Sequence, residues 1–265
     1  MLYDTHCHLD YFESNDKIRE VIEEAKKVGV RYLMNAGVYV SEIDREIEIC
    51  EKFNDSDFNI ICAVANHPEN IRTTGVITTE ELKQVAIKNK YIKAIGETGL
   101  DTHRPENYDF LNEQIKSFEN HIEVAIELKL PLIVHAYGKD AIEKSVDIVC
   151  QIAKKTPFKV VMHCYDGDYE QAKKIVDIDG YISKSGTATF KKPILISEVV
   201  AKIPIEKLVI ETDAPYLAPA PVRGQTNCPA FLQYTAKFIS DFLHIDYEEF
   251  CKITTENGMR LFNQK

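Results

Sequence analysis

The stretch LYDTHCHLD, residues 2–10, begins as a short apolar strand and ends in polar residues that include a His-x-His pair. In an extended backbone alternate side chains lie on the same face, so His6 and His8 point the same way. Two imidazoles on one face at the end of a strand form half of a metal site. Because histidine pairs are also common on surfaces and in cores, this stretch alone leaves the metal hypothesis open.

Strand-like and helical segments alternate along the rest of the chain. After the opening stretch, we expect strands at residues 31–35, 59–65, 91–96, 131–134, 159–162, 181–183 and 207–210. Among the intervening helices, Thr79 is expected to cap one, Pro193 to lie in the first turn of another, and Asp246 and Glu249 to form a capping box.

Eight alternating units in a chain of 265 residues predict a parallel sheet closed into a (β/α)8 TIM barrel. We expect one domain over residues 1–265, because no linker-like or low-complexity stretch separates the units. An open doubly wound sheet is the alternative, which the absence of a G-x-G-x-x-G motif weakens.

The composition limits the cellular setting and the partners. The net charge of −10 provides no basic field, so a polyanion would have to be held by local cations or bound metal ions. Seven cysteines without a C-x-x-C pair indicate reduced thiols. Met1 leads almost directly into the first strand, and no apolar run is long enough to span a membrane. We therefore expect a cytoplasmic protein, with a nuclear location as the alternative, and no membrane partner.

Polar residues that can bind metals stand where the expected strands end. They are His6, His8, His67, Glu97, His135, His163 and Asp213. Barrel enzymes build their active sites at the carboxyl ends of their strands. Five of the eight histidines occupy such positions, whereas His121 and His244 are scattered. This clustering is the strongest indication of function in the sequence.

The number of these residues suggests two metal ions. His6, His8 and Asp213 can hold one ion, His135 and His163 the other, and Glu97 can bridge them. Mixed imidazole and carboxylate ligands suit zinc, manganese or cobalt, and magnesium where waters complete the shell. Two such ions can activate water and stabilise a phosphoryl transfer. A single structural metal or a metal-free mouth is disfavoured, because structural zinc prefers thiolate sets.

Several motifs in one order resemble the TatD family of metal-dependent deoxyribonucleases, within the amidohydrolase superfamily. The residues that carry the resemblance are Thr5–Asp10, His67–Pro68, Ala94–Asp101, Pro131–His135, His163–Tyr165, Glu211–Pro219, Arg223–Gly224, Asn227, Pro229, Asn257 and Arg260–Phe262. The resemblance implies a two-metal barrel that hydrolyses DNA, as a 3′–5′ exonuclease on single-stranded or frayed 3′ ends.

The same resemblance assigns roles to individual residues. It implies six metal ligands: His6, His8, Glu97, His135, His163 and Asp213. Asp213 is the expected proton acceptor for water, and Glu97 and His67 complete the expected catalytic set. His67 is expected beside the substrate phosphate rather than on a metal.

The chain departs from the family pattern where substrate should bind. Residues 136–141, AYGKDA, replace a Ser-Arg-Asp-Ala motif; Tyr165-Asp166-Gly167 replaces Phe-Ser-Gly; and Lys184 stands where an aromatic residue is common. Besides His67, we expect Arg223, Lys184 and Tyr165 to contact substrate, with Lys191 and Lys192 as solvated lysines by default. Tyr137, Tyr165 and Tyr216 are candidates either for stacking on bases or for half-buried packing. His103 follows the Glu97 loop and is expected at the surface, with lining of the pocket as the alternative.

Two other functions compete with DNA hydrolysis. The same chemistry could cleave a small ester, an amide or an aminoacyl-tRNA bond, since barrels exchange substrates through their loops. A relative with a carboxylated lysine bridge would fit that reaction better, and here Glu97 holds the bridging position. The complete ligand set argues against a binding protein that has lost its site. We expect a monomer with DNA as its partner.

Overall fold

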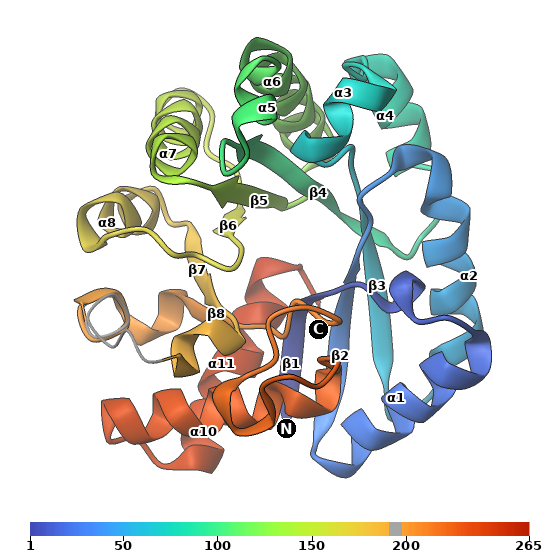
Figure 1. Cartoon of the computed structure of the whole chain (residues 1–265), viewed down its shortest axis with the longest axis vertical. Coiled ribbons are helices and arrows are strands. Elements are labelled where there is room, and N and C mark those ends of the chain that lie inside the picture. Colours follow the sequence, from blue (N-terminus) through green and yellow to red (C-terminus); the bar gives the residue numbers. More distant parts are fainter. Residues whose placement is uncertain (191–197, 265) are drawn as a thin grey trace.

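The computed structural model describes residues 1–190 and 198–264, which form a barrel of eight parallel strands in sequential order (Figure 1). The strands are β1 (Leu2–Cys7), β2 (Val30–Ala36), β3 (Asn59–Val64), β4 (Ile92–Asp101), β5 (Leu132–Tyr137), β6 (Val160–Met162), β7 (Tyr181–Lys184) and β8 (Leu208–Ile210). Hydrogen bonds from Thr5 Oγ1 to the carbonyl of Ile210 and from the Asp213 N–H to the carbonyl of His6 join β8 to β1. The predicted TIM barrel is confirmed.

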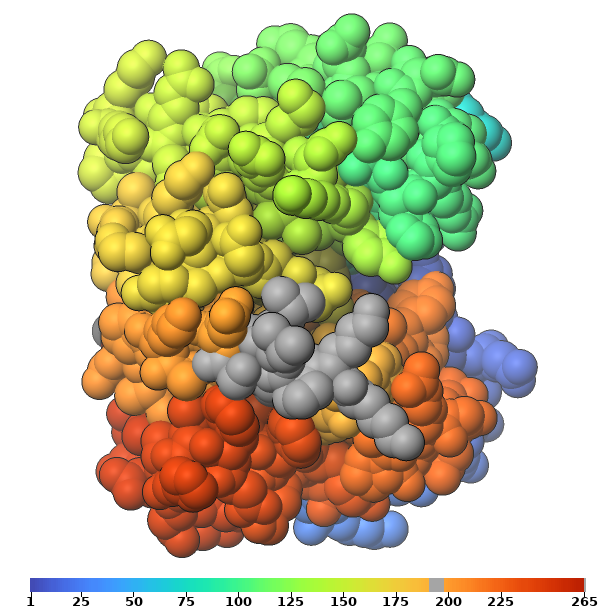
Figure 2. All heavy atoms as spheres, turned by 60° about the vertical axis from the view of Figure 1, so that its left-hand side comes forward, coloured from blue at the N-terminus to red at the C-terminus, as the bar shows by residue number. Residues whose placement is uncertain are grey.

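Helices surround the strands, and those of the second half of the chain follow one another in sequence order along one side (Figure 2). They are α1 (Asn15–Lys27), α2 (Ile43–Phe53), α3 (Ile71–Thr74), α4 (Thr79–Ala86), α5 (Pro105–Tyr108), α6 (Leu111–Leu128), α7 (Lys139–Ala153), α8 (Tyr169–Asp177), α10 (Leu232–Leu243) and α11 (Tyr247–Leu261). No helix in the described ranges has the length and apolar character needed to cross a membrane.

The helix caps correct two details of the sequence interpretation. The N-cap of α4 is Thr78 rather than Thr79, because Thr78 and Glu81 form the capping box. In α11, Asp246 accepts hydrogen bonds from the backbone N–H groups of Glu248 and Glu249, and no return bond from the Glu249 side chain is found within residues 198–264. The helix expected to contain Pro193 lies outside the described residues, as do Lys191 and Lys192.

The barrel is filled from its amino-terminal end, which leaves its other end for a site. Inward side chains of the strands pack with Leu261 and Phe262 from the end of the chain. The Phe262 ring lies 5.8 Å from the ring of Tyr3, and both side chains are almost fully buried. A larger apolar layer lies between the sheet and the helices. The polar residues at the carboxyl ends of the strands therefore lie next to a packed layer of mainly apolar side chains that fills the barrel interior.

Strand β4 is longer than the sequence pattern indicates, and this places Glu97 inside the sheet. Gly96 and Gly99 have φ values of +140° and +145°, and a Cβ atom on Gly99 would lie 2.0 Å from the carbonyl oxygen of His135. Only glycine allows β4 and β5 to approach so closely there. The strand consequently continues to Asp101, with Gly99 beside His135 in the register.

Candidate metal centre

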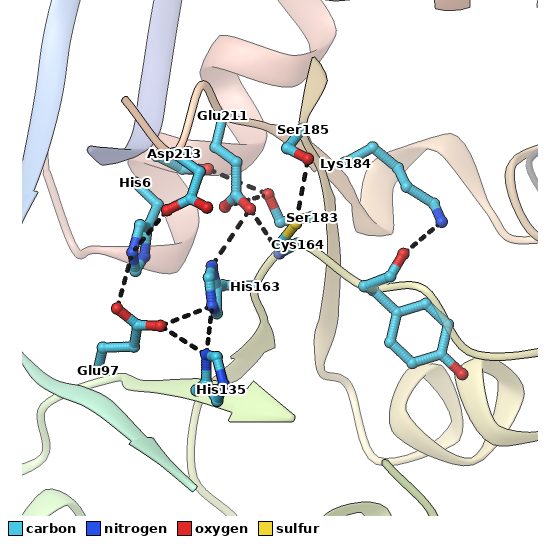
Figure 3. A network of polar contacts seen from close by, with 12 residues as sticks. His6, Glu97, His135, His163, Cys164, Ser183, Lys184, Ser185, Glu211 and Asp213 are labelled. Atoms are coloured by element: carbon cyan, nitrogen blue, oxygen red, sulfur yellow. Dashed lines mark hydrogen bonds and ion pairs between the residues drawn. The ribbon is translucent and has the colours of Figure 1, made fainter. Parts of the chain in front are cut away.

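Side chains from five strand ends converge on Glu97, whose two oxygens face different groups of donors. Figure 3 shows His6 on one side of Glu97, and His135 and His163 on the other. Glu97 is 3 % exposed, and His6 is fully buried. All six predicted ligands take part in this cluster.

The first group of donors surrounds Glu97 Oε2. His6 Nε2 lies 3.2 Å and His8 Nε2 3.6 Å from this oxygen, and the two nitrogens are 3.3 Å apart. Asp213 Oδ1 lies 3.4 Å from His8 Nε2 and 3.8 Å from His6 Nε2. Four ligands around one ion, each about 2.0–2.2 Å from it, are about 3.3–3.6 Å apart in a tetrahedron. Three of these five distances fall in that range, and the other two, 3.2 Å and 3.8 Å, lie just outside it, so this group of donors could close around a metal ion with small shifts.

The second group surrounds Glu97 Oε1. His135 Nδ1 lies 2.7 Å and His163 Nε2 2.8 Å from this oxygen, with 3.2 Å between the two nitrogens. These three donors line the mouth of the barrel together with Asp213. Three protein donors that face a cavity are typical of catalytic metal sites, which leave a position for water or substrate.

Hydrogen bonds on the outer side of the rings direct the inner nitrogens toward the centre. His8 Nδ1 donates to the carbonyl of Ala36 at 2.8 Å, and His135 Nε2 donates to Asp101 Oδ2 at 3.1 Å. Burial lowers the pKa of both rings, but hydrogen bonds to carboxylates and the charge of Glu97 raise it to about 9 for His8 and about 8 for His135, so with protein groups alone the inner nitrogens also carry protons near neutral pH. The 2.7 Å between His135 Nδ1 and Glu97 Oε1 is accordingly a hydrogen-bond distance. A divalent ion would displace these protons, because histidine binds a metal through an unprotonated nitrogen.

Glu211 is a further carboxylate beside the centre, and the sequence analysis did not predict a role for it. Its Oε1 lies 3.4 Å from His163 Nδ1 and accepts the backbone N–H of Cys164, while its Oε2 accepts the Ser183 hydroxyl at 2.6 Å. Glu211 is 1 % exposed. Its place two residues before Asp213 was the available signal. Asp101, which accepts from His135, was missed as well, although it is the last residue of the 94–101 motif.

The electrostatics keep Glu97 and Asp213, the two predicted carboxylate ligands, ionised. Burial raises the pKa of Glu97, but the charges of His163, His67 and His6 outweigh it and hold that pKa well below its usual range. Burial likewise opposes ionisation of Asp213, and the hydrogen bond from His8 helps lower its pKa. Ionised carboxylates are the forms that bind metals.

His67 faces the centre as a donor. Its Nδ1 accepts the backbone N–H of Glu69 at 3.2 Å, so the ring proton lies on Nε2. That nitrogen is 3.3 Å from Glu97 Oε1. A nitrogen that carries a proton can donate to a phosphate oxygen but cannot bind a metal in the same state. The geometry thus agrees with the expectation that His67 contacts substrate, which stays a prediction.

The other residues expected to bind substrate lie farther from the centre. Lys184 is 4 % exposed, its ammonium donates to the carbonyl of Tyr165 at 2.5 Å, and Figure 3 shows it directed away from Glu97. Burial lowers its pKa to about 8. Tyr165 is 3 % exposed and its hydroxyl donates to the carbonyl of Asp168. Arg223 is exposed over the ring of Phe190, 4.3 Å from its centre. Their roles in substrate binding stay predictions.

A pocket of about 400 Å³ opens above the second group of donors. Its lining includes His135, His163 and Asp213 from the centre, with Tyr137 and Tyr216 at the rim. His103, for which lining of the pocket was the alternative to a surface position, also lines it. The signal for His103 was its place just after the quoted 94–101 motif.

A (β/α)8 barrel with paired histidine and carboxylate donors at the carboxyl ends of its strands defines a metal-dependent hydrolase. Residues 3–263 match the family described as TatD related DNase, and the chain belongs to this family. The predicted family is thus confirmed.

Related proteins match over nearly their whole length. The chain is 36 % identical to the uncharacterized metal-dependent hydrolase YabD of Bacillus subtilis, over 99 % of both chains. It is 32 % identical to the uncharacterized metal-dependent hydrolase YcfH of Escherichia coli K12, over 99 % of this chain and 96 % of that protein. The structure of YJJV, a TatD homolog from Escherichia coli K12, shares the fold with a TM-score of 0.89 at 22 % identity, covering 100 % of this chain and 98 % of the other.

Proposed function

We propose that this protein is a deoxyribonuclease that removes nucleotides from single-stranded or frayed 3′ ends of DNA by hydrolysis of phosphodiester bonds with two divalent metal ions. The observation that supports this proposal best is the position of Glu97 between two groups of donors. Two divalent ions held by these groups would suit the displacement of an alcohol from a phosphodiester, because both the entering and the leaving oxygens need stabilisation.

The residues that would hold the ions are His6, His8 and Asp213 for one and His135 and His163 for the other, with Glu97 shared. The chemistry that two bound divalent ions supply in such sites is activation of water and neutralisation of developing charge.

The protein's own groups orient the substrate and move the proton. His67 Nε2–H lies at the mouth and donates a hydrogen bond to a phosphate oxygen. Asp213 is ionised and borders the pocket, so its carboxylate accepts the proton of the attacking water. The packed barrel floor below the centre excludes other water molecules.

A second function, hydrolysis of a small ester, an amide or an aminoacyl-tRNA bond, is favoured by one observation. The pocket walls carry the carboxylates of Glu69, Asp101 and Asp166, which repel a polyanion. The bridging Glu97 and the family membership favour the nuclease.

One experiment distinguishes the two functions. Protein stripped with a chelator is incubated with end-labelled single- and double-stranded oligonucleotides and with small aryl esters, while Mg²⁺, Mn²⁺ or Zn²⁺ is added back. We expect a ladder that shortens from the 3′ end, only when a divalent ion is present. His163→Ala should lose this activity, whereas the matched control His244→Ala should keep it. Ester hydrolysis without any DNA cleavage would contradict the nuclease proposal.

A further inference from the structure

Two aromatic rings stack on one rim of the pocket. The rings of Tyr137 and His103 lie 4.2 Å apart with an angle of 22° between them. Tyr137 ends β5, two residues after His135, and alternate residues of a strand share a face. Its side chain is 46 % exposed and lines the pocket with His103. A large ring left this exposed at a site mouth is available to a ligand.

Backbone contacts fix this stack relative to the metal centre. The Thr102 N–H donates to the carbonyl of Tyr137 at 2.9 Å, which ties the loop after β4 to the end of β5. The His103 N–H donates to Asp101 Oδ1 at 2.9 Å, and Asp101 Oδ2 accepts from His135 Nε2 at 3.1 Å. One carboxylate therefore connects a metal ligand with the loop that carries the stack, so both are positioned before substrate arrives.

Apart from the metal centre and His67, the charges of the pocket leave little for phosphate groups to bind. Among its described lining residues, Arg104 is the one lysine or arginine, and its guanidinium lies 3.6 Å from a carboxylate oxygen of Glu69. Asp101 and Asp166 add further negative charge. Nucleic-acid binding usually depends on phosphate contacts from basic side chains. Beyond the phosphate contacts proposed for the metal centre and His67, affinity in this pocket has to come from elsewhere, and stacking of a base on an aromatic ring is the established alternative.

We propose that Tyr137 and His103 form a binding site for the nucleobase next to the scissile phosphate, and that Tyr137 supplies its stacking surface. This inference rests on the proposed function and adds how the substrate is held. The pocket of about 400 Å³ accommodates one small molecule rather than a duplex segment. The lining also contains Tyr216, which is 53 % exposed. The site thus takes a single unpaired terminal nucleotide.

The test compares substrates with and without a base. Cleavage of a single-stranded oligonucleotide is measured beside the same oligonucleotide with an abasic terminal residue, using wild type, Tyr137→Ala and Tyr137→Phe. In parallel, binding of dAMP and of 2-deoxyribose 5-phosphate to the metal-loaded proteins is measured by calorimetry. Tyr108→Ala is the matched control, because Tyr108 is 47 % exposed and lies outside the lining of the pocket.

We expect Tyr137→Ala to lower kcat/KM for the normal oligonucleotide and affinity for dAMP by roughly 5- to 150-fold, the range for loss of one stacked base. The abasic substrate and deoxyribose phosphate should be little affected, and Tyr137→Phe should restore base dependence. Equal losses with and without a base, or no loss at all, would overturn the inference. DNA cleavage without base dependence refutes the stacking site alone. If dAMP binding depends on the base and on Tyr137 but no DNA is cleaved, the proposed nuclease activity is refuted and the nucleobase site is supported.

Discussion

Acid should weaken this fold through His121, a buried histidine of α6 outside the metal centre. Its Nδ1 donates to the carbonyl of Ser117 at 2.7 Å, and its Nε2 accepts the backbone N–H of Asn66 at 3.1 Å. The ring is therefore neutral, with its proton on Nδ1. A second proton on Nε2 would face the N–H of Asn66. Burial lowers the pKa of His121 to about 4.

The size and sign of the effect follow from this pKa. The unfolded chain has a histidine pKa of about 6.5, so the two states differ by roughly 2.5 units, or about 3 kcal/mol. Because the folded pKa is the lower one, the unfolded state binds the proton first. The contribution of a neutral His121 is fully present above pH of about 6.5 and is lost as the pH falls toward about 4. Asn66 precedes His67, a predicted substrate contact. The hydrogen bond from the Asn66 N–H to His121 Nε2 therefore also helps to hold the loop that carries His67.

The assay is urea unfolding at pH values between 7.5 and 4.5, in excess chelator, for wild type and His121→Gln. Glutamine can accept the Asn66 N–H but does not titrate, so groups common to both proteins cancel. We expect the free energy of unfolding of wild type, relative to the variant, to fall by about 2–3 kcal/mol over this interval. A difference that stays constant with pH would refute the reasoning.

Three further predictions concern the site. Glu97→Ala should release both metals whereas His135→Ala releases chiefly one, as elemental analysis at matched metal concentrations would show; retention of both ions by Glu97→Ala would exclude bridging. Asp101→Asn should weaken metal binding by about 10- to 100-fold through His135, measured by competition with a chromophoric chelator, and unchanged affinity would contradict its orienting role. Arg223→Ala should raise KM and flatten the salt dependence of cleavage, whereas Lys184→Met should lower the free energy of unfolding by about 1–3 kcal/mol with KM unchanged. A raised KM for Lys184→Met would instead establish the predicted phosphate contact.

Local patterns predicted the barrel and its candidate metal ligands. Alternating strand and helix periodicities depend on near neighbours in the sequence, and eight such units in a chain of this length favour a closed barrel over an open sheet. Since parallel strands end at the same edge, residues such as His6, His135 and His163 could be placed together without coordinates. Glu97 and Asp213 were placed beside them by the same argument, and the resemblance to a known family, carried by motifs of adjacent residues, assigned the same six ligands.

The tertiary structure decided what depends on contacts between distant segments. Strand β4 continues to Asp101 because Gly99 allows β5 to approach closely, which a pattern of apolar residues does not encode. The same register brings Asp101 to His135 and the loop of His103 to Tyr137. Lys184 illustrates the converse, since its position at a strand end predicted a substrate contact while its side chain lies buried against Tyr165. The direction of a side chain depends on the space that neighbouring strands and loops leave for it, and that space exists only in the assembled barrel.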